Sequence, residues 1–334
     1  MTDFSSDAKH DDPVAAEKKS SVETYQYEVL VPYEKWKKTL MAAEKTPNKQ
    51  QWQVLNLVHQ RCLYEQSEEV SHNINKAPAE GHQEPLFRLI HGLPGSGKSQ
   101  LLKWIQTYFE EVWHWTNGVQ FQFLAPLNGM AVSISGQTVH SWGGISFQNR
   151  DGISVGSGVV RKGKDNVEQM HVKCAKLRFL FVDECECVGA VLAADLEQAT
   201  SYGVPTHHSY KHHTLEEYKK FFYTRGFGGI NTFLVGDFYQ LPPVGGTPLM
   251  SNPRSQTVLE NARVANMRNR VWSCADDDLP GSLQGWSERY CATGCKVMDL
   301  EVNHRSGGEK RLSDCLKSCR EGNLDEMWIV ASMS

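Results

Sequence analysis

Long apolar runs are missing from this sequence of 334 residues: none approaches the roughly 20 residues that a membrane-spanning helix needs. We therefore expect no membrane association. The opening stretch, MTDFSSDAKHDDPVAAEKKSS, holds four Asp and no apolar core, so it lacks the pattern of a secretory signal and of an acid-poor mitochondrial transit peptide. A basic excess is missing too, since the formal net charge is -4, although a local basic groove for nucleic acid is compatible with that balance.

Cysteine is present but follows no disulfide pattern. The nine cysteines are odd in number and irregularly spaced. Because no signal segment accompanies them, they predict a soluble protein of a reducing, intracellular compartment. With 40% hydrophobic and 10% aromatic residues, the chain can form a sizeable core, and its length fits one large or two modest domains.

Composition divides the chain into four parts. We expect a disordered tail, an N-terminal helical region, a polar linker and an α/β domain, at residues 1–22, 23–70, 71–85 and 86–330. The helical region is predicted from apolar side chains at helical spacing, namely Trp52, Leu55, Val58 and Leu63.

Short apolar strands alternate with helical stretches in the α/β domain. The clearest are Leu86–Gly92, Val119–Pro126, Leu177–Glu184 and Asn231–Asp237. Polar residues follow these strands, which predicts a parallel sheet flanked by helices, with ligands at its carboxyl edge. We expect residues 143–170 and 195–226 to be surface excursions.

A phosphate-binding loop lies between the first of these strands and the next helical stretch. The string GLPGSGKS, which runs from Gly92 to Ser99, fits the pattern G-x-x-x-x-G-K-[ST] in full. Gly92, Gly95, Ser96 and Gly97 let backbone N–H groups surround phosphates, and the helix start adds positive potential. Lys98 can reach the β and γ phosphates and the Ser99 hydroxyl can bind Mg²⁺. The alternative is a glycine-rich turn without a ligand.

Two acids supply the second half of a nucleotide site. The apolar strand FLFV ends in Asp183 and Glu184. Asp183 is a candidate Mg²⁺ ligand through its water shell, and Glu184 is a candidate for polarising the attacking water. Together with the phosphate loop, this pair predicts a P-loop NTPase, a class that includes kinases, GTPases and motor ATPases.

A longer string narrows that class. The segment FGGINTFLVGDFYQLPPV, from Phe227 to Val244, resembles the third motif of the Pif-one-like DNA helicases, the petite integration frequency family of helicase superfamily one, related to RecD and the Helitron helicases. Other segments are similar in the same order: PNKQQWQVLNLV from Pro47, APLNGMAVSISGQTVHSW from Ala125, and LEVNHRSGGEKRLSDCLKSCREGNL from Leu300. The resemblance spans about residues 45–325.

The resemblance implies a RecA-like fold, ATP and Mg²⁺ as cofactors, and particular residue roles. Gln51 corresponds to the adenine-contacting glutamine, Gln240 to a sensor of the γ-phosphate, and Arg305 to the arginine finger. DNA contacts are carried over to Thr138, His140 and Ser141. The implied partners are single-stranded DNA and duplex junctions, and the implied compartment is the nucleus, with mitochondria as the alternative.

The chain departs from the family pattern at several places. Leu127-Asn128 stands where the family has Thr-Gly, so the hydroxyl and the glycine expected beside the strand are missing. Cys185-Glu186-Cys187 replaces Ile-Ser-Met, and Ser306 replaces a glutamine. A second RecA-like domain needs roughly 100–150 residues, and fewer follow Arg305. We therefore expect the second motor domain to be absent, through truncation or because a separate partner supplies it.

These observations favour an ATP-dependent DNA helicase that moves 5′ to 3′ on single-stranded DNA, with a role in DNA repair, recombination or telomere and genome maintenance. The alternative is a truncated module that binds ATP or single-stranded DNA without unwinding. A third class, a kinase for a small acceptor, is disfavoured by the GDFYQ string.

Other clusters have weaker functional interpretations. The segment HHSYKHH, from His207 to His213, and the pairs Cys291/Cys295 and Cys315/Cys319 are candidate metal sites, but a surface loop and core thiols are the favoured explanations. Among the tryptophans, Trp142 is the best candidate for stacking on a base, whereas Trp113 and Trp115 are expected in the core.

Overall fold

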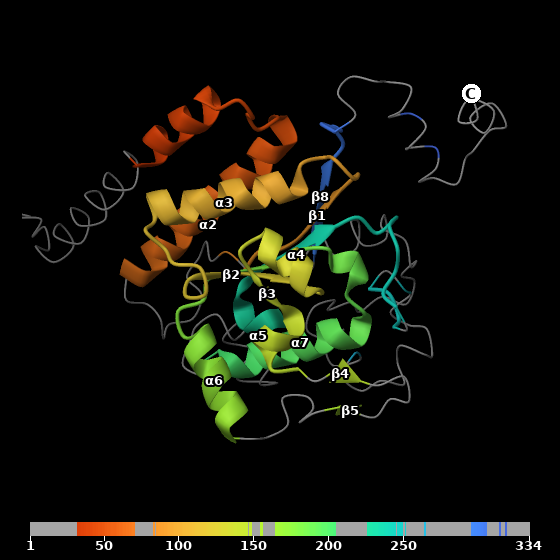
Figure 1. Ribbon diagram of the computed structural model, residues 1–334. Coiled ribbons are helices and arrows are strands. Elements are labelled where there is room, and N and C mark those ends of the chain that lie inside the picture. Colours follow the sequence, from red (N-terminus) through yellow and green to blue (C-terminus); the bar gives the residue numbers. More distant parts are fainter. Residues whose placement is uncertain are drawn as a thin grey trace, which may run out of the picture.

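The structure is a computed structural model of the whole chain, shown in Figure 1. It describes residues 32–70, 83, 85–145, 147–148, 154–155, 164–204, 226–244, 246–249, 251, 264, 295–305, 314 and 318. The expected tail, most of the expected linker and the segment from His207 to His213 lie outside the described residues.

One parallel sheet organises the described part of the chain. Its strands are β1 (Phe87–Gly92), β2 (Phe121–Ala125), β3 (Gln137–Thr138), β6 (Phe179–Val182), β7 (Asn231–Gly236) and β8 (Lys296–Leu300). Within the described residues the order is β3-β2-β6-β7-β1-β8, and every pairing is parallel. The strand carrying GDFYQ therefore lies between the strand of the phosphate loop and the strand of Asp183.

Alternate strand residues face two separate cores. Phe179, Phe181 and Phe233 point to one face, where they stack on one another and on Phe109 of α3 (Lys98–Val112). Leu180 and Val182 point to the other face. This period of two, with apolar residues on both faces, is what a strand covered by helices on both sides requires.

Helices cover both faces, as Figure 1 shows. A first helix at residues 32–42, α2 (Lys49–Val70) and α3 pack on the phenylalanine face. The other face carries α5 (Val139–Gly143), α6 (Lys164–Cys174) and α7 (Ala190–Gly203). Shorter elements are α4 (Asn128–Ser133), the 3-10 turns η1 (Cys185–Cys187) and η3 (Gly226–Gly229), and the antiparallel pair β4 (Phe147–Gln148) and β5 (Ser154–Val155). The fold class predicted from the sequence, an α/β P-loop NTPase with a RecA-like parallel sheet, is confirmed.

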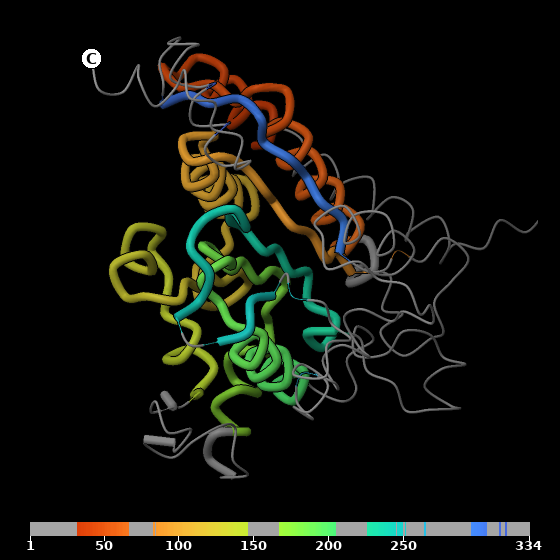
Figure 2. Tube along the Cα trace, turned by 90° about the vertical axis from the view of Figure 1, so that its right-hand side faces the viewer, coloured from red at the N-terminus to blue at the C-terminus, as the bar shows by residue number. Residues whose placement is uncertain are grey.

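The helical region and the last strand are distant in sequence but adjacent in space. Figure 2 shows the segment of β8 running beside the N-terminal helices. The Glu301 backbone N–H, just after β8, donates to Gln50 Oε1 of α2 at 2.9 Å. Leu55 and Val58 of α2 are buried, as the helical spacing predicted, and Trp52 and Leu63 pack against the same core.

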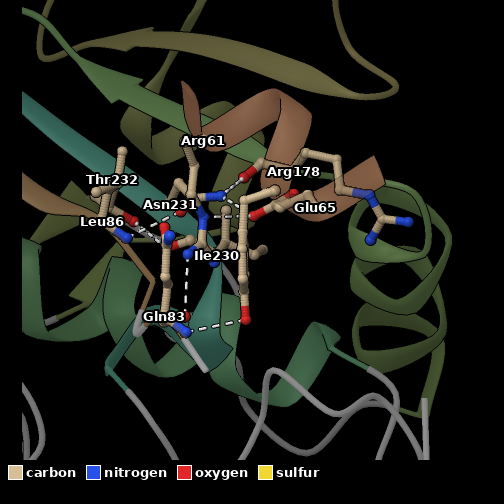
Figure 3. Close-up of polar contacts among 9 residues, drawn as sticks. Arg61, Glu65, Gln83, Leu86, Arg178, Ile230, Asn231 and Thr232 are labelled. Carbon is tan, nitrogen blue, oxygen red and sulfur yellow. Dashed lines mark hydrogen bonds and ion pairs between the residues drawn. The ribbon is translucent and has the colours of Figure 1, made fainter. Parts of the chain in front are cut away.

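A buried polar network fastens α2 to the opposite, amino-terminal edge of the sheet (Figure 3). Arg61 Nε donates to Glu65 Oε1 at 3.0 Å, and Asn231 Nδ2 donates to the same oxygen. Asn231 Nδ2 also donates to the Arg178 carbonyl, and Asn231 Oδ1 accepts from Leu86 N at 2.9 Å. Through these bonds Asn231, at the start of β7, joins α2 to the residues that precede β1 and β6.

The structure corrects two expectations from the sequence. Residues 195–203 were expected in a surface excursion, but they form the second half of α7, where Leu196, Ala199 and Thr200 are buried. Ile145 and Met170, within the other expected excursion, also belong to the core. No helix in the described ranges is long and apolar enough to cross a membrane.

Candidate nucleotide site

The phosphate loop lies between β1 and α3 and has the backbone that its glycines allow. Gly95 and Gly97 adopt φ values of 83° and 84°, a left-handed conformation that other residues rarely take. Gly97 is the N-cap of α3, so the first N–H groups of this helix face the loop. The loop therefore has the conformation that a phosphate-binding turn needs.

Two side chains of the loop have polar atoms placed for a ligand. The Lys98 ammonium donates to the carbonyls of Gly92 at 2.7 Å and Leu93 at 3.3 Å, which keeps it on the loop. Ser96 Oγ is buried and has no hydrogen-bond partner among the described residues. Ser99, the next residue after Lys98, is exposed. An orphaned buried hydroxyl beside a lysine and exposed hydroxyl fits an anionic, oxygen-rich ligand.

The segment after β8 contacts the phosphate loop. His304 N donates to the Gly95 carbonyl at 2.8 Å. A Cβ on Gly95 would lie 2.6 Å from Arg305 Cβ and 2.7 Å from Asn303 Oδ1. Arg305 is itself exposed. The structure thus brings the predicted arginine finger next to the predicted phosphate loop.

Gln51 joins the start of α2 to the same loop. Its backbone N donates to Asn48 Oδ1 and its Oε1 accepts from Asn48 N, both at 2.9 Å, which is the reciprocal pattern of a capping box. Gln51 Nε2 donates to the Ser96 carbonyl at 3.2 Å. The side chain is buried, so its adenine contact remains a prediction, while its contact with the loop is direct.

Asp183 and Glu184 lie at the end of β6, as predicted, and a third acid joins them. Burial, followed by the neighbouring charge of Glu184, raises the pKa of Asp183 from 3.8 to about 6. Lys98 acts in the opposite direction on this pKa, so its ammonium is electrostatically close to Asp183. Glu184 has φ 49°, a strained value for a residue with a side chain. Its carboxyl is hydrogen-bonded to that of Glu186.

Glu186 was not singled out from the sequence. It is buried, and burial and the bond with Glu184 raise the pKa of this carboxyl from 4.5 to about 8. Its Oε2 accepts from the Asp237 backbone N–H at 3.2 Å. The signal that could have found it is the departure from the family pattern, which has a serine at this position.

The loop after β7 is ordered by Asp237. Asp237 Oδ1 accepts from Tyr239 N at 3.2 Å, and Asp237 Oδ2 accepts from Gln240 Nε2 at 3.4 Å. Gln240 N donates to the Asp237 carbonyl at 2.8 Å. Asp237 is buried, whereas Tyr239 and Gln240 are exposed, so the acid anchors a loop whose next side chains reach the surface.

The residues expected to contact DNA lie around the start of α5, at the far edge of the sheet from β8. Thr138 is the N-cap of α5, and its Oγ1 accepts from Ser141 N at 3.2 Å. Ser141 is exposed, and partial burial lowers the pKa of His140, which favours the neutral imidazole. The stacking role expected for Trp142 is wrong: the ring is buried and packs beside Lys173, whose ammonium donates to the Trp142 carbonyl at 2.6 Å.

The described residues contain no group of three or more His, Cys, Asp or Glu side chains that could hold a metal ion. Of the four cysteines considered for zinc, only Cys295 lies within the described residues, where it is buried in the core. Trp113 is buried and Trp115 packs against the core, as expected.

The parallel sheet, the phosphate loop and the acids at the end of β6 define the fold as an α/β P-loop NTPase. Solved structures similar to this chain are Pif1 helicases. The Candida albicans Pif1 helicase is 19% identical, with a TM-score of 0.48, over 85% of this chain and 46% of that chain. A Bacteroides Pif1 bound to ssDNA is 17% identical, with a TM-score of 0.49, over 86% and 49%. A Bacteroides complex with ADP-AlF3 and ssDNA is 18% identical, with a TM-score of 0.48, over 85% and 48%.

The chain therefore spans about half the length of the solved structures that it matches. No family model and no curated protein matches it.

Proposed function

We propose that this chain is an ATP-hydrolysing motor domain of a DNA helicase of the Pif-one-like type. The observation that carries the proposal is convergence: the phosphate loop after β1, the acids after β6 and the segment of Arg305 after β8 meet at one edge of the sheet. The order of the strands places the GDFYQ loop of β7 between the first two of these.

Each residue then has a defined task. Lys98 exchanges its two carbonyl bonds for phosphate oxygens, and Ser96 Oγ gains the partner that it lacks. Ser99 and Asp183 would hold Mg²⁺, which supplies charge neutralisation on the phosphates when bound. Glu184 orients and polarises the attacking water, and Arg305 stabilises charge in the transition state.

The remaining assignments concern the two substrates. Gln51, which already contacts the phosphate loop, is proposed to position adenine. Gln240 is proposed to respond to the γ-phosphate through the loop that Asp237 orders. Thr138, His140 and Ser141 are proposed to contact single-stranded DNA; the neutral His140 would contribute a hydrogen bond and not a charge. The family resemblance gives the direction of movement as 5′ to 3′.

A matched pair of lysines tests the hydrolytic assignment. Lys98 and Lys103 both lie on α3, but Lys103 is exposed in the second turn of the helix and has no proposed role. Lys98→Ala is expected to lower ATP hydrolysis stimulated by single-stranded DNA by roughly 100-fold or more, because it removes charge stabilisation of the transferring phosphoryl group. Lys103→Ala should keep the parent rate. Equal rates in both variants and the parent would refute the assignment.

Strand separation distinguishes a motor from a binding module. The purified chain is added with ATP and Mg²⁺ to duplexes that carry a single-stranded tail at either the 5′ or the 3′ end. Separation of the 5′-tailed substrate alone is the expected result. Hydrolysis without separation would favour the non-unwinding module, and turnover stimulated by a small acceptor but not by DNA would favour a kinase.

A further inference from the structure

A row of polar side chains crosses the carboxyl edge of the sheet beneath the nucleotide site. It consists of Glu186, Asp237, His91 and Asp299, which follow or end the adjacent strands β6, β7, β1 and β8 in their spatial order. Three of the four are buried, and Asp299 is half exposed. Each member belongs to a different strand, so the row links segments that are far apart in the sequence.

His91 is the centre of this row. Its Nδ1 lies 3.0 Å from Asp299 Oδ1, and its Nε2 lies 3.4 Å from Asp237 Oδ1. A neutral imidazole has one N–H and can donate to one of these carboxylates, whereas an imidazolium can donate to both. The ring also lies 5.9 Å from the ring of Tyr239, in the loop after β7. His91 therefore touches its neighbours on both sides of β1.

Asp237 links His91 to the two acids after β6. Its backbone N–H donates to Glu186, whose carboxyl is bonded to Glu184. Its own carboxylate holds Tyr239 N and Gln240 Nε2. A displacement of Asp237 would thus move the proposed γ-phosphate sensor and the turn of Glu184 together.

The other end of the row leads to Arg305. Asp299 pairs with His91 one residue before the end of β8, and the chain then continues directly to the segment that lies on Gly95. His91 itself immediately precedes Gly92, the first residue of the phosphate loop. A single imidazole is therefore adjacent to three segments that the proposed hydrolysis requires.

We propose that His91 is a positioning residue that couples the loop of β7, the phosphate loop and the segment of Arg305 through its two carboxylate partners. The proposal rests on the proposed function for its catalytic consequence, but not for the coupling itself. A positioning defect should appear in the transition state more than in nucleotide binding, because the phosphate loop keeps its own contacts.

The kinetic test compares two buried histidines. His91→Ala is expected to lower kcat of DNA-stimulated ATP hydrolysis about tenfold and to leave KM for ATP within about twofold. His59→Ala is the control, since His59 is equally buried, bonds to Tyr108 Oη at 2.7 Å and lies outside the site. It should lower thermal stability without changing kcat for the folded protein. Equal kcat effects of the two variants would overturn the proposal.

A double variant and a mild variant separate coupling from simple loss of stability. If His91 acts through Gln240, His91→Ala combined with Gln240→Ala should be no slower than Gln240→Ala alone. Asp299→Asn removes one carboxylate from a half-exposed side chain, so the fold should persist, and kcat should fall about threefold. Multiplicative effects of His91→Ala and Gln240→Ala, or a parent kcat in Asp299→Asn, would contradict the coupling.

A spectroscopic readout judges the coupling even if the chain does not hydrolyse ATP. Protein labelled with 3-fluorotyrosine gives a ¹⁹F signal for Tyr239, assigned by its loss in Tyr239→Phe. In the full chain without nucleotide, His91→Ala and Asp299→Asn should both shift or broaden this signal, and His59→Ala should not. An unchanged Tyr239 signal in His91→Ala would overturn the proposal. Absence of hydrolysis in the parent, with the expected shift, would overturn only the proposed function.

Discussion

Gly236 illustrates how one backbone position can depend on a side chain from another strand. It ends β7, and the carboxyl group of Glu186 occupies the space where a side chain at this position would lie. A Cβ at this position would collide with Glu186 Oε2 and lie 2.9 Å from Cys185 Sγ. The glycine of the GDFYQ string is therefore required by packing between β7 and the turn after β6.

We expect Gly236→Ala to lower the free energy of unfolding by about 2 kcal/mol or more, because the added methyl group meets atoms in a buried, filled space. Urea denaturation of the parent and the variant measures this. Gly129→Ala is the matched control: apart from its chain neighbours and the backbone of its own helix, no atom lies within 4 Å of its added Cβ, and alanine favours the helix α4. The idea fails if both substitutions change stability by the same amount.

The buried carboxyl of Glu186 gives a pH dependence of stability. Burial and the bond with Glu184 raise the pKa of Glu186 from 4.5 to about 8 in the folded chain. Between these two pH values, Glu186 therefore keeps a proton in the folded chain that it has lost in the unfolded chain. Stability from this source is full below pH 4.5 and is lost as the pH rises through 8.

Glu186→Gln keeps an acceptor for Asp237 N and has no proton to lose. Relative to the parent, we expect it to become more stable as the pH rises from about 4.5 to 8, by roughly 1–2 kcal/mol. This is less than the full conversion of 1.36 kcal/mol per pKa unit, because relaxation and water penetration reduce the penalty of a buried charge. Urea denaturation at several pH values measures the difference. A difference that is constant with pH would contradict the prediction.

Among single residues, the sequence could identify those whose identity is fixed by a string. Lys98 stands at the start of α3, and Asp183 and Glu184 follow β6, where the motifs predicted them. Glu186, His91 and Asp299 could not be found in the same way, because their interactions depend on which strands are neighbours. The half-turn between Glu184 and Glu186, for example, is visible only once η1 is known. Trp142 was misjudged because a nearby motif does not say which face of a helix is buried.

Among elements, the network of Figure 3 predicts how α2 is attached to the sheet. Arg61 and Glu65 are both buried, so removing one leaves the other without its main partner. We expect Arg61→Met to lower the free energy of unfolding by about 3 kcal/mol, the usual cost of breaking a buried ion pair. The double variant Arg61→Met/Glu65→Gln should lose less, since no charge remains buried. Urea denaturation of the single and the double variant shows which of them is less stable.

The exposed pair Gln106 and Glu110 on α3 provides a control for that experiment. Gln106 Nε2 donates to Glu110 Oε1 at 2.9 Å, but in contact with solvent. Gln106→Ala should change stability by less than about 0.5 kcal/mol. A double variant of the buried pair that is less stable than Arg61→Met would argue that the network does not act through the buried charge.

Helices and strands with a clear hydrophobic pattern could be located from the sequence, and those without one could not. Four apolar strands were located to within about two residues, and the helical spacing of α2 was correct. Strand β3 was not foreseen because two residues carry no periodicity, and β8 because Lys296–Leu300 mixes charged and apolar side chains at the sheet edge. Helix α7 was misread because its buried face uses small residues such as Ala199, and because Glu197 is buried with Ser201 as its partner.

For the molecule as a whole, strand order is what the sequence could not supply. The order β3-β2-β6-β7-β1-β8 depends on pairing between distant segments, which no local pattern encodes. That order decides that β7 separates the two halves of the nucleotide site and that β8 carries Arg305 to the phosphate loop. Motifs identified the components of the site, and the topology determined which of them are neighbours.

If these components form one site, nucleotide should protect several distant segments at the same time. We expect an ATP analogue that is not hydrolysed, added with Mg²⁺, to slow hydrogen exchange in residues 92–99, 183–187, 236–240 and 301–305. Each of these segments either lies at the proposed ligand site or contacts a segment that does. Chelating Mg²⁺ with EDTA should reduce the protection of 183–187 more than that of 92–99, since Asp183 is proposed to act through the metal. Helix α6, on the far face of the sheet, is the internal control and should not respond. Mass spectrometry of the exchanged chain resolves these segments, and protection confined to the phosphate loop would show that the others do not share its site.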